Sequence, residues 1–190
     1  ADDDQMGRTS EEQLFNIMPT VFPHLAPALL QLLPVEPDSD PDDVEGVEWS
    51  VSMAAAQCLK SIAICIGDSV VDIVQQFTTS NIDSADWRMR EAAVMAYGTI
   101  MDGPEEKLTP QLPIALPKLL ALMLSDPSLH VRDTAAWALG TACNVHTQIV
   151  MRPDLLSLLL SHVLEVLRRR DDPSVCASAC WMVDSVAYCL

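Results

Sequence analysis

The sequence has few glycines, aromatic residues and basic residues, and it has no segment in which polar and apolar residues alternate as in a β-strand. Of its 190 residues, 6 are glycine, 11 are lysine or arginine and 5% are aromatic. It also lacks a glycine-rich loop that could hold a phosphate, and an apolar run as long as a membrane span. These absences disfavour a β-sheet protein, a nucleotide-binding enzyme and a protein inserted in a membrane.

The histidines and cysteines form no pattern typical of a metal site or a catalytic site. No histidine has a cysteine or carboxylate at the spacing of a ligand set, and the cysteines form no Cys-x-x-Cys pair. We therefore expect no metal, no cofactor and no enzymatic activity. Free cysteine behaves as a small apolar residue, so we expect reduced core thiols in a cytosolic or nuclear protein. The six cysteines are Cys58, Cys65, Cys143, Cys176, Cys180 and Cys189.

Acidic residues predominate, and they are concentrated near the start of the sequence. The net charge is −16, and residues 1–48 contain 12 of the 27 acidic residues but only one basic residue, Arg8. Such a chain repels nucleic acid and anionic membranes and favours a basic partner, although a solubilising surface is the simpler interpretation. Residues 34–48 combine prolines with acids and predict an exposed, mobile loop. Its candidate binding acids are Asp38, Asp40, Asp42, Asp43, Glu45 and Glu48.

An internal repeat is the clearest positive signal. Residues 90–98 and 132–140 both begin with arginine and an acid and end with glycine, and they lie 42 residues apart. A period of this length is typical of stacked helical hairpins of the HEAT or armadillo type. We therefore predict an all-α solenoid, whose function lies on the long faces that the stack exposes.

Proline and aspartate interruptions divide the chain into four expected hairpins. They cover approximately residues 10–66, 68–102, 108–144 and 151–190, and the acidic loop lies inside the first. Asp68, Asp86, Asp126 and Asp172 are the predicted N-caps of helices. The whole chain, residues 1–190, is expected to be a segment of a longer solenoid.

The tryptophans suggest where a partner binds. Trp137 and Trp181 occupy equivalent positions on helix faces that are otherwise small or polar, and Trp49 directly follows the acidic loop. Packing between repeats is the usual role of tryptophan, and we favour it for Trp87. Exposed indoles beside carboxylates would instead hold an extended basic peptide. The carboxylates expected to contribute are Glu91, Asp133 and Asp184, whereas Arg90 and Arg132 are expected to be structural.

Several of these segments resemble the importin-β (karyopherin-β) family. The resemblance is carried by residues 86–98 followed by Gly103-Pro104, by residues 126–128 and 131–137, and by Cys180-Trp181. It is specific from about residue 47 to residue 190. The chain is similar to the middle HEAT repeats of such a receptor.

The resemblance implies a nuclear import receptor that shuttles between cytoplasm and nucleus. The second helix of each hairpin would line a concave surface that binds the basic segment of importin-α, basic cargo proteins and the GTP form of Ran. Trp49, Trp137 and Trp181 match the tryptophans that grip the basic segment, and the acidic loop would contribute to both interactions. Convex grooves would bind Phe-Gly nucleoporins, although no motif marks one. The alternative is a HEAT scaffold unrelated to transport, which would more often have Leu or Val at the tryptophan positions.

Overall fold

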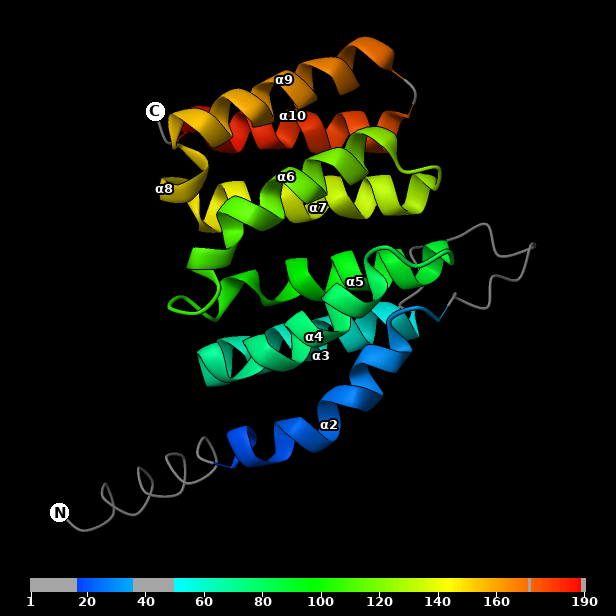
Figure 1. Ribbon diagram of the computed structural model, residues 1–190, viewed down its shortest axis with the longest axis vertical. Coiled ribbons are helices and arrows are strands. Elements are labelled where there is room, and N and C mark those ends of the chain that lie inside the picture. The colour runs from blue at the N-terminus through cyan, green and yellow to red at the C-terminus, as the bar shows by residue number, and fades with distance from the viewer. Residues whose placement is uncertain (1–16, 36–49, 171, 189–190) are drawn as a thin grey trace, which may run out of the picture.

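The computed structural model describes residues 17–35, 50–170 and 172–188 as stacked α-helices with short 3₁₀ turns and no strand (Figure 1). The predicted all-α solenoid is therefore confirmed for this part of the chain. The helices are α2 (Met18–Leu32), α3 (Val51–Ile66), α4 (Val71–Asn81), α5 (Trp87–Thr99), α6 (Leu112–Ser125), α7 (Leu129–Val145), α8 (Thr147–Val150), α9 (Pro153–Arg169) and α10 (Pro173–Tyr188).

Successive helices pair as α2–α3, α4–α5, α6–α7 and α9–α10 (Figure 1). The second helices form a continuous layer, because α5 packs against α3 and α7, and α7 packs against α10. In the first-helix layer, α6 packs against α9, but α4 and α6 barely touch. The solenoid therefore has one closed layer and one layer that opens between α4 and α6.

The buried residues explain why the helices stack in this way. In α9 a narrow apolar stripe is buried, formed by Leu155, Leu159, Val163 and Val166 at spacings of three and four residues. Helix α7 is instead buried on most of its circumference, largely through alanines, because α5, α6 and α10 all contact it. Small side chains on α7 allow these neighbouring helices to approach closely.

Two of the four predicted N-caps are confirmed. The carboxylate of Asp86 accepts a hydrogen bond from the N–H of Arg88 at 3.0 Å, directly before α5. The carboxylate of Asp172 accepts from the N–H groups of Ser174 and Val175 at 2.8 and 3.2 Å, directly before α10. Both aspartates thus satisfy backbone donors that the first helical turn leaves unpaired.

The other two predicted caps are wrong, because the aspartates bind partners from other repeats. Helix α7 begins after Ser128, and Asp126 lies at the end of α6, where it pairs with Arg90. Asp68 lies in a 3₁₀ turn that precedes α4, and it accepts the backbone N–H of Lys107 at 3.0 Å. Asp126 also accepts the N–H of Ser128 at 2.8 Å, but Ser128 and not Asp126 is the N-cap of α7.

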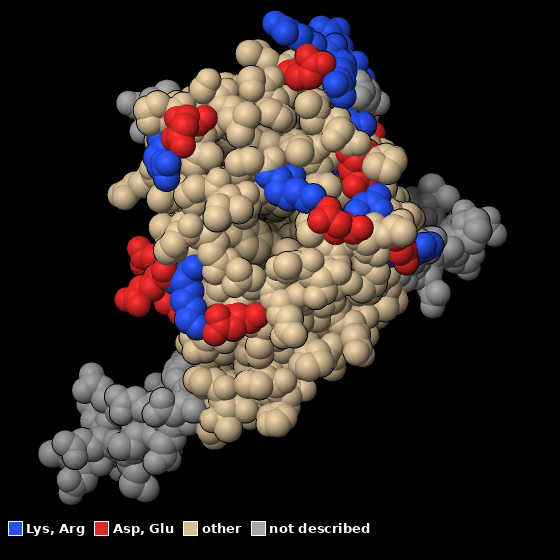
Figure 2. Space-filling view, in the orientation of Figure 1, with Lys and Arg blue, Asp and Glu red and all other residues tan. Residues whose placement is uncertain are grey.

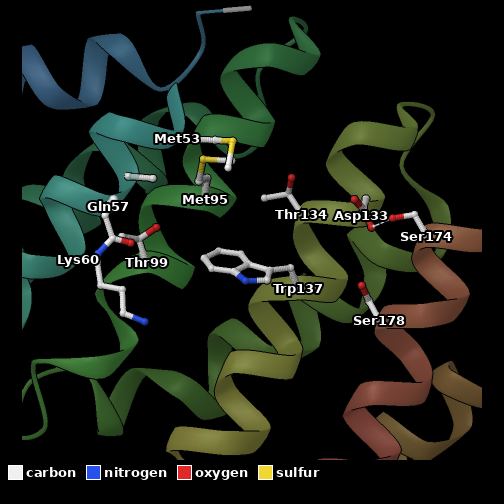
Figure 3. A pocket seen from close by; sticks show the side chains of 11 residues that line it. Met53, Gln57, Lys60, Met95, Thr99, Asp133, Thr134, Trp137, Ser174 and Ser178 are labelled. Carbon is white, nitrogen blue, oxygen red and sulfur yellow. Dashed lines mark hydrogen bonds between the residues drawn. The ribbon is translucent and has the colours of Figure 1, made fainter. Parts of the chain in front are cut away.

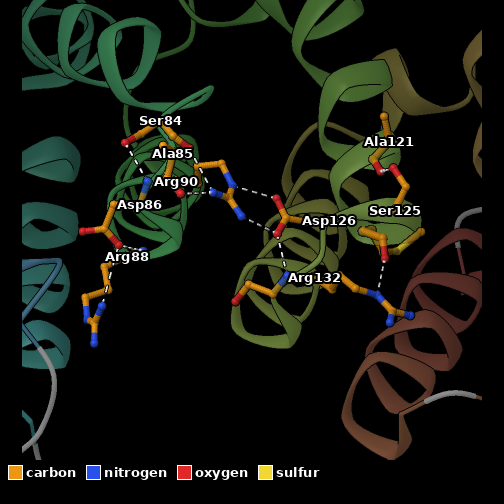
Figure 4. A network of polar contacts seen from close by, with 11 residues as sticks. Ser84, Ala85, Asp86, Arg88, Arg90, Ala121, Ser125, Asp126 and Arg132 are labelled. Carbon is orange, nitrogen blue, oxygen red and sulfur yellow. Dashed lines mark hydrogen bonds and ion pairs between the residues drawn. The ribbon is translucent and has the colours of Figure 1, made fainter.

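Arg90 joins the second and third hairpins, as expected for a structural arginine (Figure 4). Its Nε and Nη2 donate to the two carboxylate oxygens of Asp126 at 2.8 Å each, and its Nη1 donates to the carbonyls of Ser84 and Ala85. The two charged side chains are only 12% and 3% exposed. Arg132 has a related structural role, because its Nε donates to the Met123 carbonyl of α6 at 3.1 Å.

The expectation of core thiols is wrong for most of the cysteines that the structure describes. Cys143 is buried and Cys176 is half-buried, but Cys58, Cys65 and Cys180 are exposed. The exposed thiols lie on α3 and α10. An apolar sequence environment does not imply burial in a solenoid, because a helix that packs on neighbours keeps a face toward solvent.

One described segment, Val51–Asn81, is long and apolar enough by length and composition to cross a membrane. We expected no run of that kind from the sequence. The segment comprises α3 and α4, which are separated by a 3₁₀ turn that begins at Gly67. Gly67 has a positive φ of 54°, a conformation that favours glycine.

Candidate binding surface

The second-helix layer exposes two indoles at equivalent positions. Trp137 on α7 is 38% exposed and Trp181 on α10 is 41% exposed. They occupy the same register on adjacent helices, and the exposure agrees with the sequence prediction. We call the exposed side of α3, α5, α7 and α10 the tryptophan surface.

Each indole lies over a glycine of the preceding second helix. A Cβ atom placed on Gly98 of α5 would lie 2.7 Å from Cζ3 of Trp137, and one placed on Gly140 of α7 would lie 2.2 Å from Cζ3 of Trp181. Carbon atoms in ordinary contact are about 3.5–4 Å apart, so no side chain fits between ring and helix. Each ring is thus partly supported and partly open to solvent.

A hollow of about 430 Å³ lies beside Trp137 (Figure 3). The indole extends from α7 toward α5 and α3, where Met53 and Met95 lie close together at one side of the hollow. Methionine is flexible and polarisable, so these residues suit a wall that adapts to a bound chain. Lys60 lies at the lower edge, where it forms an ion pair with Asp102.

The predicted acids have specific places on this surface. Asp133 accepts a hydrogen bond from Oγ of Ser174 on α10 at 2.6 Å, and Glu91 accepts one from Oγ1 of Thr134 on α7 at 3.1 Å. Each bond joins two second helices and fixes the carboxylate. Asp184 is exposed on α10. Only Asp133 of these three acids lines the hollow beside Trp137.

Other predicted residues lie outside the described part of the chain. They are Trp49 and the loop acids Asp38, Asp40, Asp42, Asp43, Glu45 and Glu48. Their roles, and the expected mobility of the loop, stay predictions.

Trp87 lies in the described part of the chain and packs between repeats, the role that the sequence favoured for it. Its ring stacks on His130 at a centroid distance of 4.7 Å, and the guanidinium of Arg88 lies 4.9 Å from the centre of the ring.

Sequence reasoning missed the methionines that line the hollow. Met95 lies 42 residues before Trp137 and therefore occupies the tryptophan position of its own hairpin. That spacing could have identified Met95 as a surface residue. The same spacing of 42 residues separates Met53 from Met95, and Met53 reaches the hollow from a different hairpin.

The opposite, first-helix face contains a groove between α4 and α6. The face is largely uncharged, and its basic and acidic side chains lie beside one another around a central hollow (Figure 2). The groove has a volume of about 270 Å³. It is lined by Gln75, Thr78, Thr79, Ile82, Val94, Tyr97, Gln111, Ile114, Ala115, Lys118 and Leu119.

Two features of this groove suit a ligand. Ile114 is 80% exposed, which is unusual for a large aliphatic side chain. Tyr97 is 6% exposed, burial raises the pKa of its phenol, and its hydroxyl has no hydrogen-bond partner among the described residues. A buried hydroxyl of this kind is normally paired. The groove therefore has an apolar wall, and the unpaired hydroxyl of Tyr97 is buried beneath its surface.

Comparison with known proteins agrees with the fold. A family model for the HEAT-like repeat matches residues 87–142. Importin subunit beta-1 of Schizosaccharomyces pombe is 41% identical over 159 residues, which cover 83% of this chain and 18% of that protein. The chain belongs to the importin-β family. Importin subunit beta-1 of Arabidopsis thaliana is 36% identical over 90% of the chain.

Solved structures of importin-β have the same arrangement of helices. The structure of yeast importin-β (Kap95p) matches with a TM-score of 0.80 and 34% identity, covering 91% of this chain and 19% of that one. The Kap95:Nup1 complex matches equally well, with a TM-score of 0.80 and 33% identity. The chain thus spans about a fifth of the length of these relatives.

Proposed function

We propose that this chain is a segment of a nuclear import receptor whose tryptophan surface binds the basic segment of importin-α or a basic cargo protein. The observation that carries the proposal is the pair of exposed indoles in equivalent positions on α7 and α10. Membership of the importin-β family supports it. The receptor would shuttle between cytoplasm and nucleus and would not act as an enzyme. The family assignment disfavours the alternative of an unrelated HEAT scaffold.

In the proposed mechanism, the tryptophans supply the close contacts with the bound chain and the carboxylates supply the charge attraction. The rings of Trp137 and Trp181 would contact the aliphatic stems and charges of lysine and arginine. The carboxylates of Glu91, Asp133 and Asp184 would attract the basic chain. Exposed ion pairs contribute little individually, so we expect the acids to affect association rate and salt dependence more than final affinity.

We propose that the acidic loop extends this electrostatic attraction and contributes to binding the GTP form of Ran. The loop acids carry much of the charge of residues 1–48, and Trp49 follows them directly. A solved structure 34% identical to this chain concerns Kap95p binding to RanGDP, whose switch loops adopt the GTP-bound conformation. That relative supports Ran as a partner of the family to which this chain belongs.

A direct test is titration of the chain with a labelled basic peptide of the importin-α segment, measured by fluorescence anisotropy. We expect saturable binding that also quenches tryptophan fluorescence and that weakens as salt rises, because salt screens exposed charges beyond about 8 Å at physiological ionic strength. The control is a peptide of the same length with its lysines and arginines replaced by serine. Equal binding of both peptides would contradict the proposal.

We also propose that the groove between α4 and α6 receives a phenylalanine side chain of a Phe-Gly nucleoporin. Ile82, Ile114 and Leu119 would contact the ring. The match to the Kap95:Nup1 complex supports a nucleoporin as partner.

Replacing Ile114 with aspartate tests this second site. Because Ile114 is 80% exposed, we expect the substitution to leave the free energy of unfolding within about 0.5 kcal/mol of the parent. A charge in the groove should weaken binding of a Phe-Gly peptide about tenfold, which corresponds to about 1.4 kcal/mol. Calorimetry with the Phe-Gly peptide measures the loss, and the basic peptide should bind unchanged. If both peptides lose affinity together, the two faces are not independent sites.

A further inference from the structure

The glycines beneath the two indoles are not required by their own backbone. Among the described glycines, only Gly67 has a positive φ. Gly98 and Gly140 lie inside α5 and α7, where alanine is accommodated in the same conformation and gives a more stable helix. The requirement for glycine at these two positions therefore comes from neighbouring residues.

The neighbouring residue is an indole in both cases. At Gly140, the three atoms nearest to an added Cβ all belong to Trp181, at 2.2, 2.3 and 3.2 Å. At Gly98 the nearest is Cζ3 of Trp137 at 2.7 Å, but Cβ of Ala138 follows at 2.9 Å. An alanine at Gly140 thus conflicts with the ring of Trp181, whereas an alanine at Gly98 would also press on the α7 backbone region. Gly140 is therefore the better position for a test, because a substitution there affects the indole alone.

In the preceding pair of second helices, α3 lacks the glycine and α5 lacks the tryptophan at the equivalent positions. With the 38-residue spacing that relates Trp49 to Trp87, the position equivalent to Gly98 is Lys60 on α3. The next second helix, α5, then has Met95 where α7 and α10 have tryptophan. Both Lys60 and Met95 line the hollow beside Trp137. Where one second helix has glycine at this position, the next second helix has an indole over it. Where it has the long side chain of lysine, the next second helix has a flexible methionine.

We propose that Gly98 and Gly140 are positioning residues for the tryptophan surface. Each leaves a bare section of helix on which the indole of the next hairpin rests, and this fixes how far the ring projects toward a bound chain. The two glycines thereby determine the affinity for a basic segment without contacting it through a side chain. This inference rests on the proposed function for its binding consequence, but not for the placement of the rings.

The test compares Gly140→Ala, Trp181→Ala and the double variant. In the parent background, Gly140→Ala should displace the indole and weaken binding of the basic peptide several-fold. In the Trp181→Ala background it should cause no further loss, because no ring remains to be displaced. Thr141→Ala on the same helix is the control, since its hydroxyl bonds the Trp137 carbonyl one turn earlier in the same helix, and this variant should bind the peptide as the parent does. An equal loss in both backgrounds would overturn the proposal.

A second measurement does not depend on peptide binding. With Trp49, Trp87 and Trp137 replaced by phenylalanine, Trp181 is the only fluorophore of its kind, and Gly140→Ala should increase its quenching by acrylamide. Unchanged quenching would overturn the proposed placement. Absence of peptide binding by the parent, with increased quenching in the variant, would instead reject only the proposed function. If Gly140→Ala lowers the melting temperature, adding Trp181→Ala should restore it. A double variant that fails to fold would show that the backbone itself requires glycine, and would overturn the proposal.

Discussion

Replacing both Trp137 and Trp181 with alanine is expected to weaken binding of the basic peptide between about 30-fold and about 1,000-fold. The range follows from about 2 kcal/mol for each interface residue of this kind, with each 1.4 kcal/mol corresponding to tenfold and the two losses not strictly additive. Both rings are more than one-third exposed, so we expect the helical content measured by circular dichroism to stay near that of the parent. Anisotropy titrations of the single and double variants measure the loss.

Trp87 provides the matched control for this experiment. It is the first residue of the second helix α5 and is half-buried, and it stacks on His130 rather than facing the hollow. Trp87→Ala should lower the free energy of unfolding while leaving peptide affinity close to that of the parent. If the double variant of Trp137 and Trp181 unfolds while the Trp87 variant weakens binding, the assignments of surface and packing roles are reversed.

Replacing Asp126 with asparagine is expected to reduce the free energy of unfolding by about 3 kcal/mol, the typical effect of removing one partner from a buried ion pair. The substitution would leave the guanidinium of Arg90 buried between the second and third hairpins without its counter-charge. Urea unfolding at neutral pH measures the effect. Asp83→Asn is the control, because its pair with Lys118 is exposed and should contribute less than about 1 kcal/mol. Similar losses for both variants would contradict a special role for the buried pair.

The stabilisation by Asp126 should depend on pH. Burial by itself raises the pKa of this carboxyl group, but the hydrogen bonds from Arg90 and Ser128 and the charge of Arg90 outweigh burial and lower the pKa. The contribution is therefore complete above the unfolded-state pKa, near pH 4, and is lost as pH falls through the lower folded-state pKa. The difference in stability between parent and Asp126→Asn should accordingly shrink below about pH 4.

A second titrating group, His146, changes the stability of the parent and of the Asp126→Asn variant equally. Burial lowers the pKa of His146, although its bond to the Met101 carbonyl and the charges of Glu105 and Asp102 oppose this effect. A histidine with a lowered pKa stabilises the fold above its unfolded-state pKa and loses that contribution as pH falls below about 6.5. Because His146 is present in both proteins, its contribution cancels in the difference that tests Asp126.

The helices themselves were predictable because their signals are local. The repeated arginine–acid–alanine segments, the apolar spacing and the aspartates before α5 and α10 act within a few residues of the structure that they specify. Asp68 and Asp126 have the same local pattern, yet they bind Lys107 and Arg90, which lie 39 and 36 residues away, and Asp126 binds the nearby N–H of Ser128 as well. A local pattern does not show that a distant donor will also bind the aspartate.

The candidate surface was predictable only in part, for the same reason. Equivalence between hairpins identified the exposed tryptophans, since residues that share a repeat position share a face. The hollow, however, combines Met53, Met95 and Trp137 from three different hairpins. The groove on the other face lies between α4 and α6, which make few contacts with each other, and no local pattern in either helix predicts that separation. The exposure of Cys58, Cys65 and Cys180 likewise depended on which helix faces have neighbours.

The sequence by itself determined that this chain is an acidic, all-helical repeat protein, with two tryptophans in equivalent positions and a family resemblance that the comparisons confirmed. The tertiary structure decided which groups those repeats bring together: Arg90 with Asp126, each indole with a glycine of the preceding hairpin, and the unpaired Tyr97 hydroxyl with an apolar groove. The physical reason is one of range. Helix propensity and capping act within one or two turns, whereas packing and charge pairing depend on the distance and angle between hairpins, which emerge only when the helices stack.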